Sequence, residues 1–198
     1  MQSIDKIHSL ISGKDIALVG NSRNVLGKHF PVDQHDIVIR MNGAWQLPEE
    51  MCNSVGRKLD ILCISGHKKE IDDIVTRVEN TVWMSPKSRD ILSVKTKEQL
   101  SFYPLEWWDE LYSEIGARPS TGCMAVDMIR RLIGEGSLTL YGFDFFAAPS
   151  WHKKYSLVER LKLLFGQEIY VNPHDGEKEA LFIQRCLPDS QLNIIKTS

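Results

Sequence analysis

The stretch that decides the fold covers residues 16–42 and reads IALVGNSRNVLGKHFPVDQHDIVIRMN. It begins with an apolar run over residues 16–19, which is short enough to be a buried strand. Gly20, Asn21 and Ser22 follow at once, and a glycine here permits a tight turn and a close approach of a ligand to the backbone. A strand, a glycine turn and the start of a helix together favour the binding of a phosphate or a ribose.

A second apolar run, residues 37–39, ends in Arg40, Met41 and Asn42. The carboxyl ends of neighbouring parallel strands meet at one edge of a sheet, where ligands bind in open α/β folds. We therefore expect the polar groups that follow the two runs to lie together at this edge.

Apolar runs and helical patterns alternate along the rest of the chain. Further strands are predicted over residues 61–64, 81–84, 137–141, 169–171 and 192–195. Helices are predicted over residues 3–11, 69–78, 123–133, 157–165 and 177–186, with a helical turn over 48–51. Residues 97–116 have a mixed, aromatic-rich pattern of helix plus loop, and residues 147–155 have a loop pattern. This alternation predicts a three-layer α/β/α, Rossmann-like domain with a mainly parallel sheet, and 198 residues suit a single domain over residues 1–198.

The composition excludes several classes of function. A formal net charge of −2 argues against nucleic acid as the main partner, because phosphate backbones select basic surfaces. No run approaches the roughly 20 apolar residues that span a bilayer, and the amphipathic N-terminus lacks the core of a signal peptide. We expect no transmembrane segment and a cytoplasmic location, with peripheral contact to the inner membrane face as an open alternative.

Residues 16–42 resemble the large motif of the eukaryotic-type sialyltransferases, glycosyltransferase family 29, which reads roughly VVGNSGNL…SHDFVIRMN. The matches in its first half are Val19, Gly20, Asn21, Ser22, Asn24 and Leu26, and those in its second half are His35, Asp36, Val38, Ile39, Arg40, Met41 and Asn42. The family has a similar Gly-x-Lys-x-Asp step further on, matched by Gly56, Lys58 and Asp60. So many matches in order are far more specific than a Gly-x-Gly pattern.

A second informative stretch, residues 118–122, reads RPSTG and precedes the helix predicted from residue 123. Ser120 or Thr121 can cap this helix, and the amides of its first turn can hold an anion. With residues 140–143, which read LYGF, the stretch resembles the small motif of the same family, PSTG…LYGF.

The resemblance implies a donor site for a CMP-activated sugar in a GT-A-like variant of the fold. It places Ser120, Thr121 and Gly122 near the donor phosphate and sugar carboxylate, and Gly142 and Phe143 near the cytidine. The full set of implied donor-binding residues is Gly20, Asn21, Ser22, Asn42, Ser120, Thr121, Gly122, Gly142 and Phe143.

Two histidines match the later motifs of the family. His174 precedes a predicted helix and Glu179 lies five residues on, which matches the last motif, a His with four residues before a Glu. His152 lies in a predicted loop, and of the third motif only this histidine and a displaced Tyr155 are present. The resemblance implies that His174 is the catalytic base, with Glu179 supporting it, and that His152 stabilises the leaving group. His35 is the other histidine within a motif match.

This chemistry fits imidazole side chains. An acceptor hydroxyl that attacks an anomeric carbon must lose a proton, and neutral imidazole can take it near pH 7. The departing CMP gains negative charge, which His152 and the amides near Ser120 can stabilise. The sequence has no Asp-x-Asp pair, Gly-x-Gly-x-x-Gly or phosphate-loop motif, so we expect no metal ion and no other cofactor.

The four cysteines are Cys52, Cys63, Cys123 and Cys186, and none forms a Cys-x-x-Cys pair. Each is expected to behave as a small buried apolar residue. Animal members of the family usually join a cysteine at the start of the large motif to one late in the small motif. Here the corresponding places lie near Asp15 and Ile133, which suits a reducing, bacterial cytoplasm.

The sequence therefore predicts an inverting, metal-independent transferase that moves sialic acid from CMP to a hydroxyl of a glycan or glycolipid. A CMP-Kdo donor is the leading alternative, and a nucleotide-binding subunit of glycan assembly without catalysis is another. A methyltransferase would need an acidic residue at the end of the second strand, where Arg40, Met41 and Asn42 stand instead. The acceptor cannot be identified. Trp107, Trp108 and Trp151 could line its site or could equally be core residues.

Overall fold

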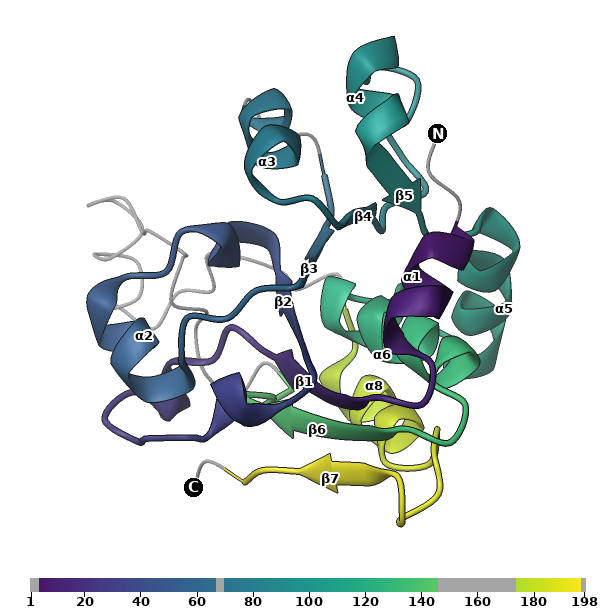
Figure 1. Cartoon of the computed structure of the whole chain (residues 1–198). Coiled ribbons are helices and arrows are strands. Elements are labelled where there is room, and N and C mark those ends of the chain that lie inside the picture. Colours follow the sequence, from purple (N-terminus) through teal and green to yellow (C-terminus); the bar gives the residue numbers. More distant parts are fainter. Residues whose placement is uncertain (1–3, 67–69, 146–173, 197–198) are drawn as a thin grey trace, which may run out of the picture.

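The structure is a computed structural model that describes residues 4–66, 70–145 and 174–196. Its centre is a seven-stranded sheet with the order β5-β4-β3-β2-β1-β6-β7 (Figure 1). Every neighbouring pair of strands is parallel, so the predicted α/β class and parallel sheet are confirmed. The strands are β1 (Asp15–Val19), β2 (Ile37–Met41), β3 (Ile61–Ile64), β4 (Thr81–Trp83), β5 (Leu100–Phe102), β6 (Ser137–Tyr141) and β7 (Leu192–Ile194).

The strand order reverses direction at β1. The chain adds β2 to β5 on one side of β1 and then returns to place β6 on the other side. Val19 at the end of β1 lies opposite Arg40 of β2 and Tyr141 of β6. In open α/β sheets a ligand crevice forms at such a reversal, beyond the carboxyl ends of the strands.

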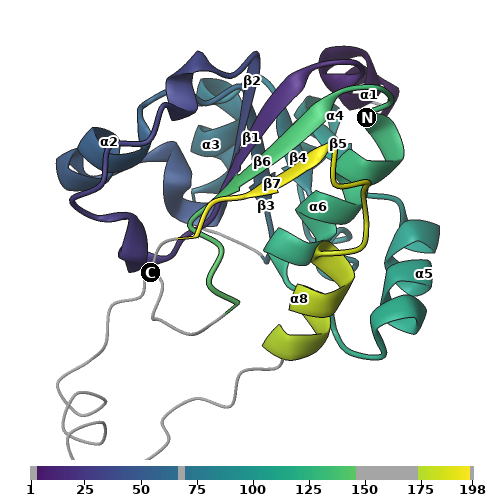
Figure 2. The ribbon, with the colours of Figure 1, turned by 90° about the horizontal axis from the view of Figure 1, so that it is seen from below.

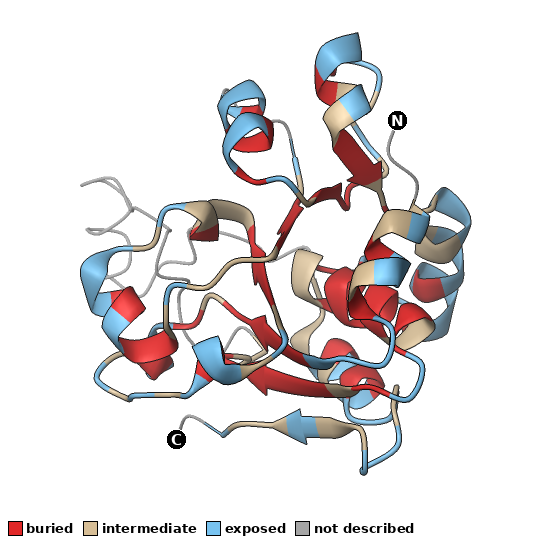
Figure 3. Cartoon of the chain, viewed as in Figure 1, coloured by how far each residue is buried: buried red, intermediate tan, exposed pale blue. Residues whose placement is uncertain are grey.

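Helices cover both faces of the sheet (Figure 2). Alternate strand residues face opposite sides, so Leu18, Ile39 and Leu140 belong to one apolar cluster, whereas Val19 and Tyr141 belong to another. The first face packs against α1 (Ile4–Ile11), α5 (Leu105–Ile115), α6 (Thr121–Leu132) and α8 (Gly176–Ile183). The second face packs against α2 (Glu49–Val55), α3 (Ile71–Arg77) and the 3-10 turns η1 (Arg23–Val25) and η2 (Val32–Gln34). The central strands are buried, while β7 is partly exposed (Figure 3).

Two predicted regions differ from the structure. The segment after Gly20 is only the short turn η1, because Gly27 has a φ of 75° and Pro31 cannot donate a backbone hydrogen bond. Within residues 97–116 the structure places a strand, β5, between α4 (Val94–Gln99) and α5. Three residues are too few to reveal a strand period in a sequence. The loop predicted over 147–155, the helix over 157–165 and the strand over 169–171 lie outside the described residues.

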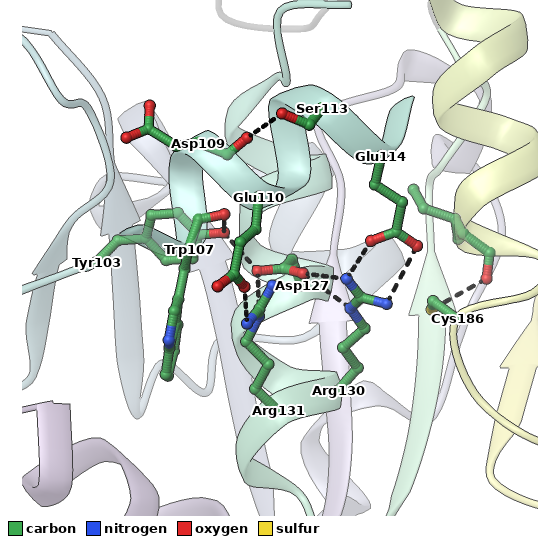
Figure 4. A network of polar contacts seen from close by, with 11 residues as sticks. Tyr103, Trp107, Asp109, Glu110, Ser113, Glu114, Asp127, Arg130, Arg131 and Cys186 are labelled. Atoms are coloured by element: carbon green, nitrogen blue, oxygen red, sulfur yellow. Dashed lines mark hydrogen bonds and ion pairs between the residues drawn. The ribbon is translucent and has the colours of Figure 1, made fainter. Parts of the chain in front are cut away.

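A buried carboxylate joins α5 to α6 (Figure 4). Asp127 of α6 is fully buried, and its oxygens accept hydrogen bonds from the Nε atoms of Arg130 at 2.8 Å and Arg131 at 2.9 Å. The hydroxyl of Tyr103 also donates to Asp127, and Glu114 of α5 lies 2.6 Å from Arg130. A charge this deep is stable because its surroundings pair it, and the network holds the helix whose N-terminus faces the predicted site.

Two further findings concern membrane-spanning helices and the cysteines. Among residues 4–66, 70–145 and 174–196, no helix is long and apolar enough to cross a membrane. All four cysteines have free thiols, three of them buried and Cys186 partly buried, as expected for apolar packing residues.

Candidate active site

Two glycines bring the ends of β1 and β6 into contact. The amide of Gly20 donates to the carbonyl of Tyr141 at 2.6 Å. A Cβ atom on Gly20 would lie 2.3 Å from the carbonyl oxygen of Gly142, and Gly142 itself has a φ of 66°. Neither position accepts a side chain without movement of the backbone, and the two motif segments therefore form one surface.

Ser22 ties the same two segments together through its side chain. Its hydroxyl donates to Asp144 Oδ2 at 2.7 Å and accepts from the amide of Asn24 at 3.1 Å, which caps η1. Ser22 is buried. Its hydroxyl therefore orders the turn, whereas Asn21 beside it is partly exposed at the strand end.

Asn42 bridges the end of β3 and the start of α6. Its Oδ1 accepts from the amide of Ser65 at 3.1 Å, and its Nδ2 lies 3.4 Å from Thr121 Oγ1. The residue adopts a φ of 53°, a conformation that Asn tolerates better than most residues. This places the last residue of the large motif beside the small motif.

The N-terminus of α6 carries the small motif. Ser120 is the N-cap, and its hydroxyl accepts from the amide of Cys123 at 3.1 Å. The ring of Phe143 lies over Gly122, where a Cβ would come within 3.2 Å of Phe143 Cε1 and 3.6 Å of Met41 Sδ. The partial positive charge of this helix end is therefore presented at the surface formed by the strand ends.

A buried carboxylate fixes the cap residue. Glu179 of α8 accepts from the amide of Ser120 at 2.7 Å and from its hydroxyl at 2.6 Å. Glu179 is only 3% exposed, and burial raises the pKa of this carboxyl to about 7, although the two hydrogen bonds oppose the shift. Asp175 N-caps α8 by accepting from the amide of Lys178 at 3.1 Å.

His174 lies against the same loop. Its Nδ1 is 2.9 Å from the carbonyl oxygen of Arg118. A carbonyl can only accept, so Nδ1 carries the proton of the neutral ring and Nε2 is the basic nitrogen. Burial lowers the pKa of His174 below its ordinary value, which outweighs the opposing effect of the hydrogen bond. The imidazole is therefore neutral near pH 7 and can act as a base.

The structure thus brings together most of the predicted site residues. The strand-end residues, the α6 N-terminus and the segment that carries the predicted base gather at the carboxyl edge of the sheet. These residues are Gly20, Asn21, Ser22, Asn42, Ser120, Thr121, Gly122, Gly142, Phe143, His174 and Glu179. His152 lies outside the described residues.

His35 does not lie at this edge. Its Nε2 is 2.9 Å from the hydroxyl of Tyr141 and its Nδ1 is 2.9 Å from Asp15 Oδ2. Asp15 begins β1 and His35 precedes β2, so the ring packs near the amino ends of these strands. This motif residue supports the sheet and lies apart from the edge where His174 is found.

The other charged residues of the large motif also support the fold. Arg40 is fully buried and donates to the carbonyls of Val55 at 2.7 Å and Lys58 at 2.8 Å, and burial lowers its pKa to about 10. The ammonium group of Lys58 donates to the carbonyls of His35 and Asp36. These contacts link β2 to the segment before β3.

The tryptophans of α5 pack against the protein. Trp107 meets the ring of Tyr103 edge-on, and the guanidinium of Arg131 lies 5.1 Å from the centre of a Trp107 ring. Trp108 stacks on Tyr112 with ring centres 5.3 Å apart. Trp107 is therefore a packing residue of the α5–α6 network, and Trp151 lies outside the described residues.

Two contact residues escaped the sequence prediction. Asp144 accepts a hydrogen bond from Ser22. Its position directly after the motif residue Phe143 could have indicated this role. Ser65 holds Asn42 through its backbone, and its position at the end of β3 follows the same strand-end rule. Within the described ranges, no three His, Cys, Asp or Glu side chains are grouped so that they could hold a metal ion.

Comparisons with known proteins identify the fold. No protein-family model and no curated protein matches the chain. Among solved structures, a mammalian sialyltransferase in complex with Gal-beta-1-3GalNAc-ortho-nitrophenol has a TM-score of 0.61 and 21% identity, over 96% of this chain and 71% of that one. The monofunctional alpha-2,3-sialyltransferase Cst-I from Campylobacter jejuni has a TM-score of 0.57 and 16% identity, over 92% and 74%. A variant of the sialyltransferase Cst-II in complex with CMP has a TM-score of 0.57 and 11% identity, over 91% and 80%. The chain has the fold of these sialyltransferases.

Proposed function

We propose that the chain is a member of the sialyltransferase family and transfers sialic acid, or a related 3-deoxy-ulosonic acid such as Kdo, from a CMP-activated donor to a hydroxyl of a glycan. The observation that supports this most is the convergence of both motif segments at the carboxyl ends of β1, β2 and β6, beside the neutral imidazole of His174. The shared fold, including that of a sialyltransferase in complex with CMP, supports the same donor.

In this proposal the donor lies across the strand ends. The phosphate and the sugar carboxylate face the N-terminus of α6 at Ser120, Thr121 and Gly122, where backbone amides and the helix dipole favour anions. The cytidine lies near Gly142 and Phe143, and the polar groups of Gly20, Asn21, Ser22 and Asn42 border the ribose and the base. The glycines matter because they let the ligand approach the backbone closely.

The proposed reaction is a direct displacement with inversion. Nε2 of His174 accepts the proton of the acceptor hydroxyl while that oxygen forms a bond to the anomeric carbon. The bond from this carbon to the phosphate oxygen breaks, and CMP leaves with the bonding electrons. The α6 N-terminus stabilises the growing charge on the phosphate, and His152 is proposed to assist. A single phosphate makes a smaller demand for charge neutralisation than a diphosphate, so the proposal includes no metal ion.

The free thiols support a proposed compartment for this reaction, and a structural neighbour supports a proposed class of acceptor. Free thiols at Cys52, Cys63, Cys123 and Cys186 suit a reducing compartment such as the bacterial cytoplasm. The acceptor is proposed to be a glycan or a glycolipid, in keeping with the galactoside bound to one structural neighbour.

The test follows the release of CMP and the formation of product. CMP-sialic acid and CMP-Kdo are offered separately, each with a β-galactoside acceptor and with EDTA present throughout. Transfer from CMP-sialic acid in EDTA supports the full proposal, and transfer from CMP-Kdo alone supports the alternative donor. Tighter binding of UDP than of CMP, or turnover that requires Mn²⁺ or Mg²⁺, would contradict it. CMP binding without turnover of either donor would indicate a non-catalytic nucleotide-binding subunit.

A further inference from the structure

The edge of the molecule beside β5 carries an unusual combination of side chains. Ile91 and Val94 are 58% and 73% exposed, the highest values among the exposed large apolar residues of the described chain. They lie three residues apart, Ile91 in the segment that leads into α4 and Val94 as the first residue of α4. In Figure 1 α4 projects at the end of the sheet, and in Figure 3 much of it is exposed.

The sequence on either side of these two apolar residues is rich in cations. Residues 87–98 contain Lys87, Arg89, Lys95 and Lys97 but only Asp90 and Glu98 as acidic residues, whereas the whole chain has a formal charge of −2. Lys87 and Lys95 are exposed. Among the described residues, the cations of this segment form no ion pair, whereas Lys6, Arg57, Arg77, Arg130 and Arg131 all do. The segment itself therefore carries two more positive than negative charges, part of which Asp72 of α3 and Glu106 offset.

Apolar packing and hydrogen bonds fix residues 87–98 to the rest of the protein. Leu92, between the two exposed residues, is buried in the cluster that includes α3. Thr96 donates its hydroxyl to Asp72 of α3, and Ser93 caps α4 by accepting from the amide of Thr96 at 3.1 Å. Arg89 donates to the carbonyl of Ser85 at 3.0 Å. The exposed apolar pair is thus displayed on an anchored support.

We propose that this surface, Ile91 and Val94 with Lys87 and Lys95 beside them, docks the protein onto an anionic lipid bilayer. Apolar side chains that insert at the headgroup boundary, flanked by lysines that attract anionic headgroups, provide the two forces that hold peripheral proteins at membranes. A second copy of the chain is a poorer partner, because two such surfaces would bring like charges together. The proposal goes beyond sugar transfer and does not depend on it.

The experiment measures co-sedimentation of the full chain with vesicles. Vesicles of phosphatidylcholine are compared with vesicles that also contain phosphatidylglycerol, at low and high salt. We expect binding to the anionic vesicles only, weakened at high salt because the Debye length falls from about 10 Å at 0.1 M to about 3 Å at 1 M. Each lysine removed should weaken binding about fivefold.

Two double variants locate the surface. Ile91→Ser with Val94→Ser removes the apolar pair, and Lys87→Ala with Lys95→Ala removes the charges; all four positions are exposed, so the fold should persist. The control for the apolar pair is Leu105→Ser with Leu181→Ser, at residues that are 47% and 52% exposed on α5 and α8. The control for the charges is Lys14→Ala with Arg185→Ala, at residues that are exposed elsewhere on the protein. Both test variants should bind at least about tenfold more weakly, with the controls unchanged.

Three results would overturn the proposal. The first is no binding to anionic vesicles, and the second is equal loss of binding in test and control variants. The third is self-association, measured without vesicles, that Ile91→Ser with Val94→Ser abolishes, which would make the surface a contact between copies. CMP affinity, measured on the same variants, separates this proposal from the proposed function, since neither outcome determines the other.

Discussion

Glu179 on α8 accepts two hydrogen bonds from Ser120 at the N-terminus of α6, one from the backbone amide at 2.7 Å and one from the hydroxyl at 2.6 Å. His174, five residues before Glu179, contacts the carbonyl of Arg118, two residues before Ser120. The proposed base and the proposed phosphate site are therefore held by one loop. A change at Glu179 should affect both the stability of this contact and the order of the site.

Glu179→Ala should lower the free energy of unfolding by about 2–4 kcal/mol. The amide of Ser120 would lose its buried partner, and the missing side chain would leave a cavity. Denaturant unfolding measures the change, and Glu177→Ala, exposed on the same helix, should cost less than about 0.5 kcal/mol. Equal stability of the two variants would show that the Glu179–Ser120 contact contributes little.

The pH dependence of stability should reveal the buried carboxyl. The pKa of Glu179 is raised from an ordinary value of 4.5 to about 7, so the folded state binds this proton more tightly than the unfolded state. Its contribution to stability is therefore full below about pH 4.5 and is lost as the pH rises through about 7, by up to about 3 kcal/mol. His174 acts oppositely, since its pKa is lowered.

Glu179→Gln isolates this contribution, because glutamine resembles the protonated acid at every pH. Unfolding by urea at pH 5, 6, 7 and 8 should show the wild type losing stability relative to Glu179→Gln as the pH rises. A constant difference across this range would mean that Glu179 does not titrate there.

Gly20→Ala should disrupt the junction of the two motif segments. The new Cβ would lie 2.3 Å from the backbone oxygen of Gly142, so the backbone must move, at a cost of about 1–3 kcal/mol. Gly122→Ala is the control within the same site, because its Cβ would lie 3.2 Å from the Phe143 ring, a side chain that can shift. Thermal unfolding and calorimetric titration with CMP should show a larger loss for Gly20→Ala on both measures. The reverse order would contradict the observed packing.

The strand ends can be predicted from the sequence because their signals are local. Short apolar runs that end in Gly20, Asn42 and Gly142, together with the strand-end rule, are sufficient to place these residues at one edge of the sheet. The helix cap at Ser120 follows from the same kind of signal, a hydroxyl just before a helical pattern.

The remaining features depend on contacts between distant segments. The sequence pattern places Arg40 among the polar groups at the ligand edge, yet its side chain is buried against the carbonyls of Val55 and Lys58. A motif match cannot separate a ligand-facing charge from one that satisfies backbone carbonyls. The partnership of Ser22 with Asp144 spans 122 residues, and no spacing rule connects them. The edge strand β5 has too few residues to show a period.

Asp127→Asn should be strongly destabilising. The substitution leaves Arg130 and Arg131 without their buried negative partner, and breaking a buried ion pair from one side typically costs about 3–5 kcal/mol. The exposed partners Glu110 and Glu114 should reduce this cost toward about 3 kcal/mol. Urea unfolding measures it against Asp109→Asn, an exposed control on α5. A loss of less than about 1 kcal/mol would indicate that the arginines are satisfied by the glutamates alone.

His174→Ala should cut turnover by roughly 10²–10⁴, the usual contribution of a positioned general base. The contact from Nδ1 to the carbonyl of Arg118 assigns Nε2 as the basic nitrogen, and in the proposed reaction this nitrogen serves the acceptor rather than the nucleotide. CMP affinity should therefore change little. His29→Ala is the matched control, because its Nδ1 also lies 2.8 Å from a backbone carbonyl, that of Asn53, while the residue is exposed.

The pH profile separates catalysis by His174 from a purely structural role. Because the pKa of His174 is lowered, the rate should fall only as the pH drops below the ordinary imidazole value of roughly 6.5. This acidic limb should disappear from the residual activity of His174→Ala and persist in His29→Ala. A folded His174→Ala protein that keeps most of its transfer rate and an unchanged acidic limb would remove His174 as the base. Since Asp15 and Tyr141 hold His35 near the amino ends of the strands, the search would then turn to His152.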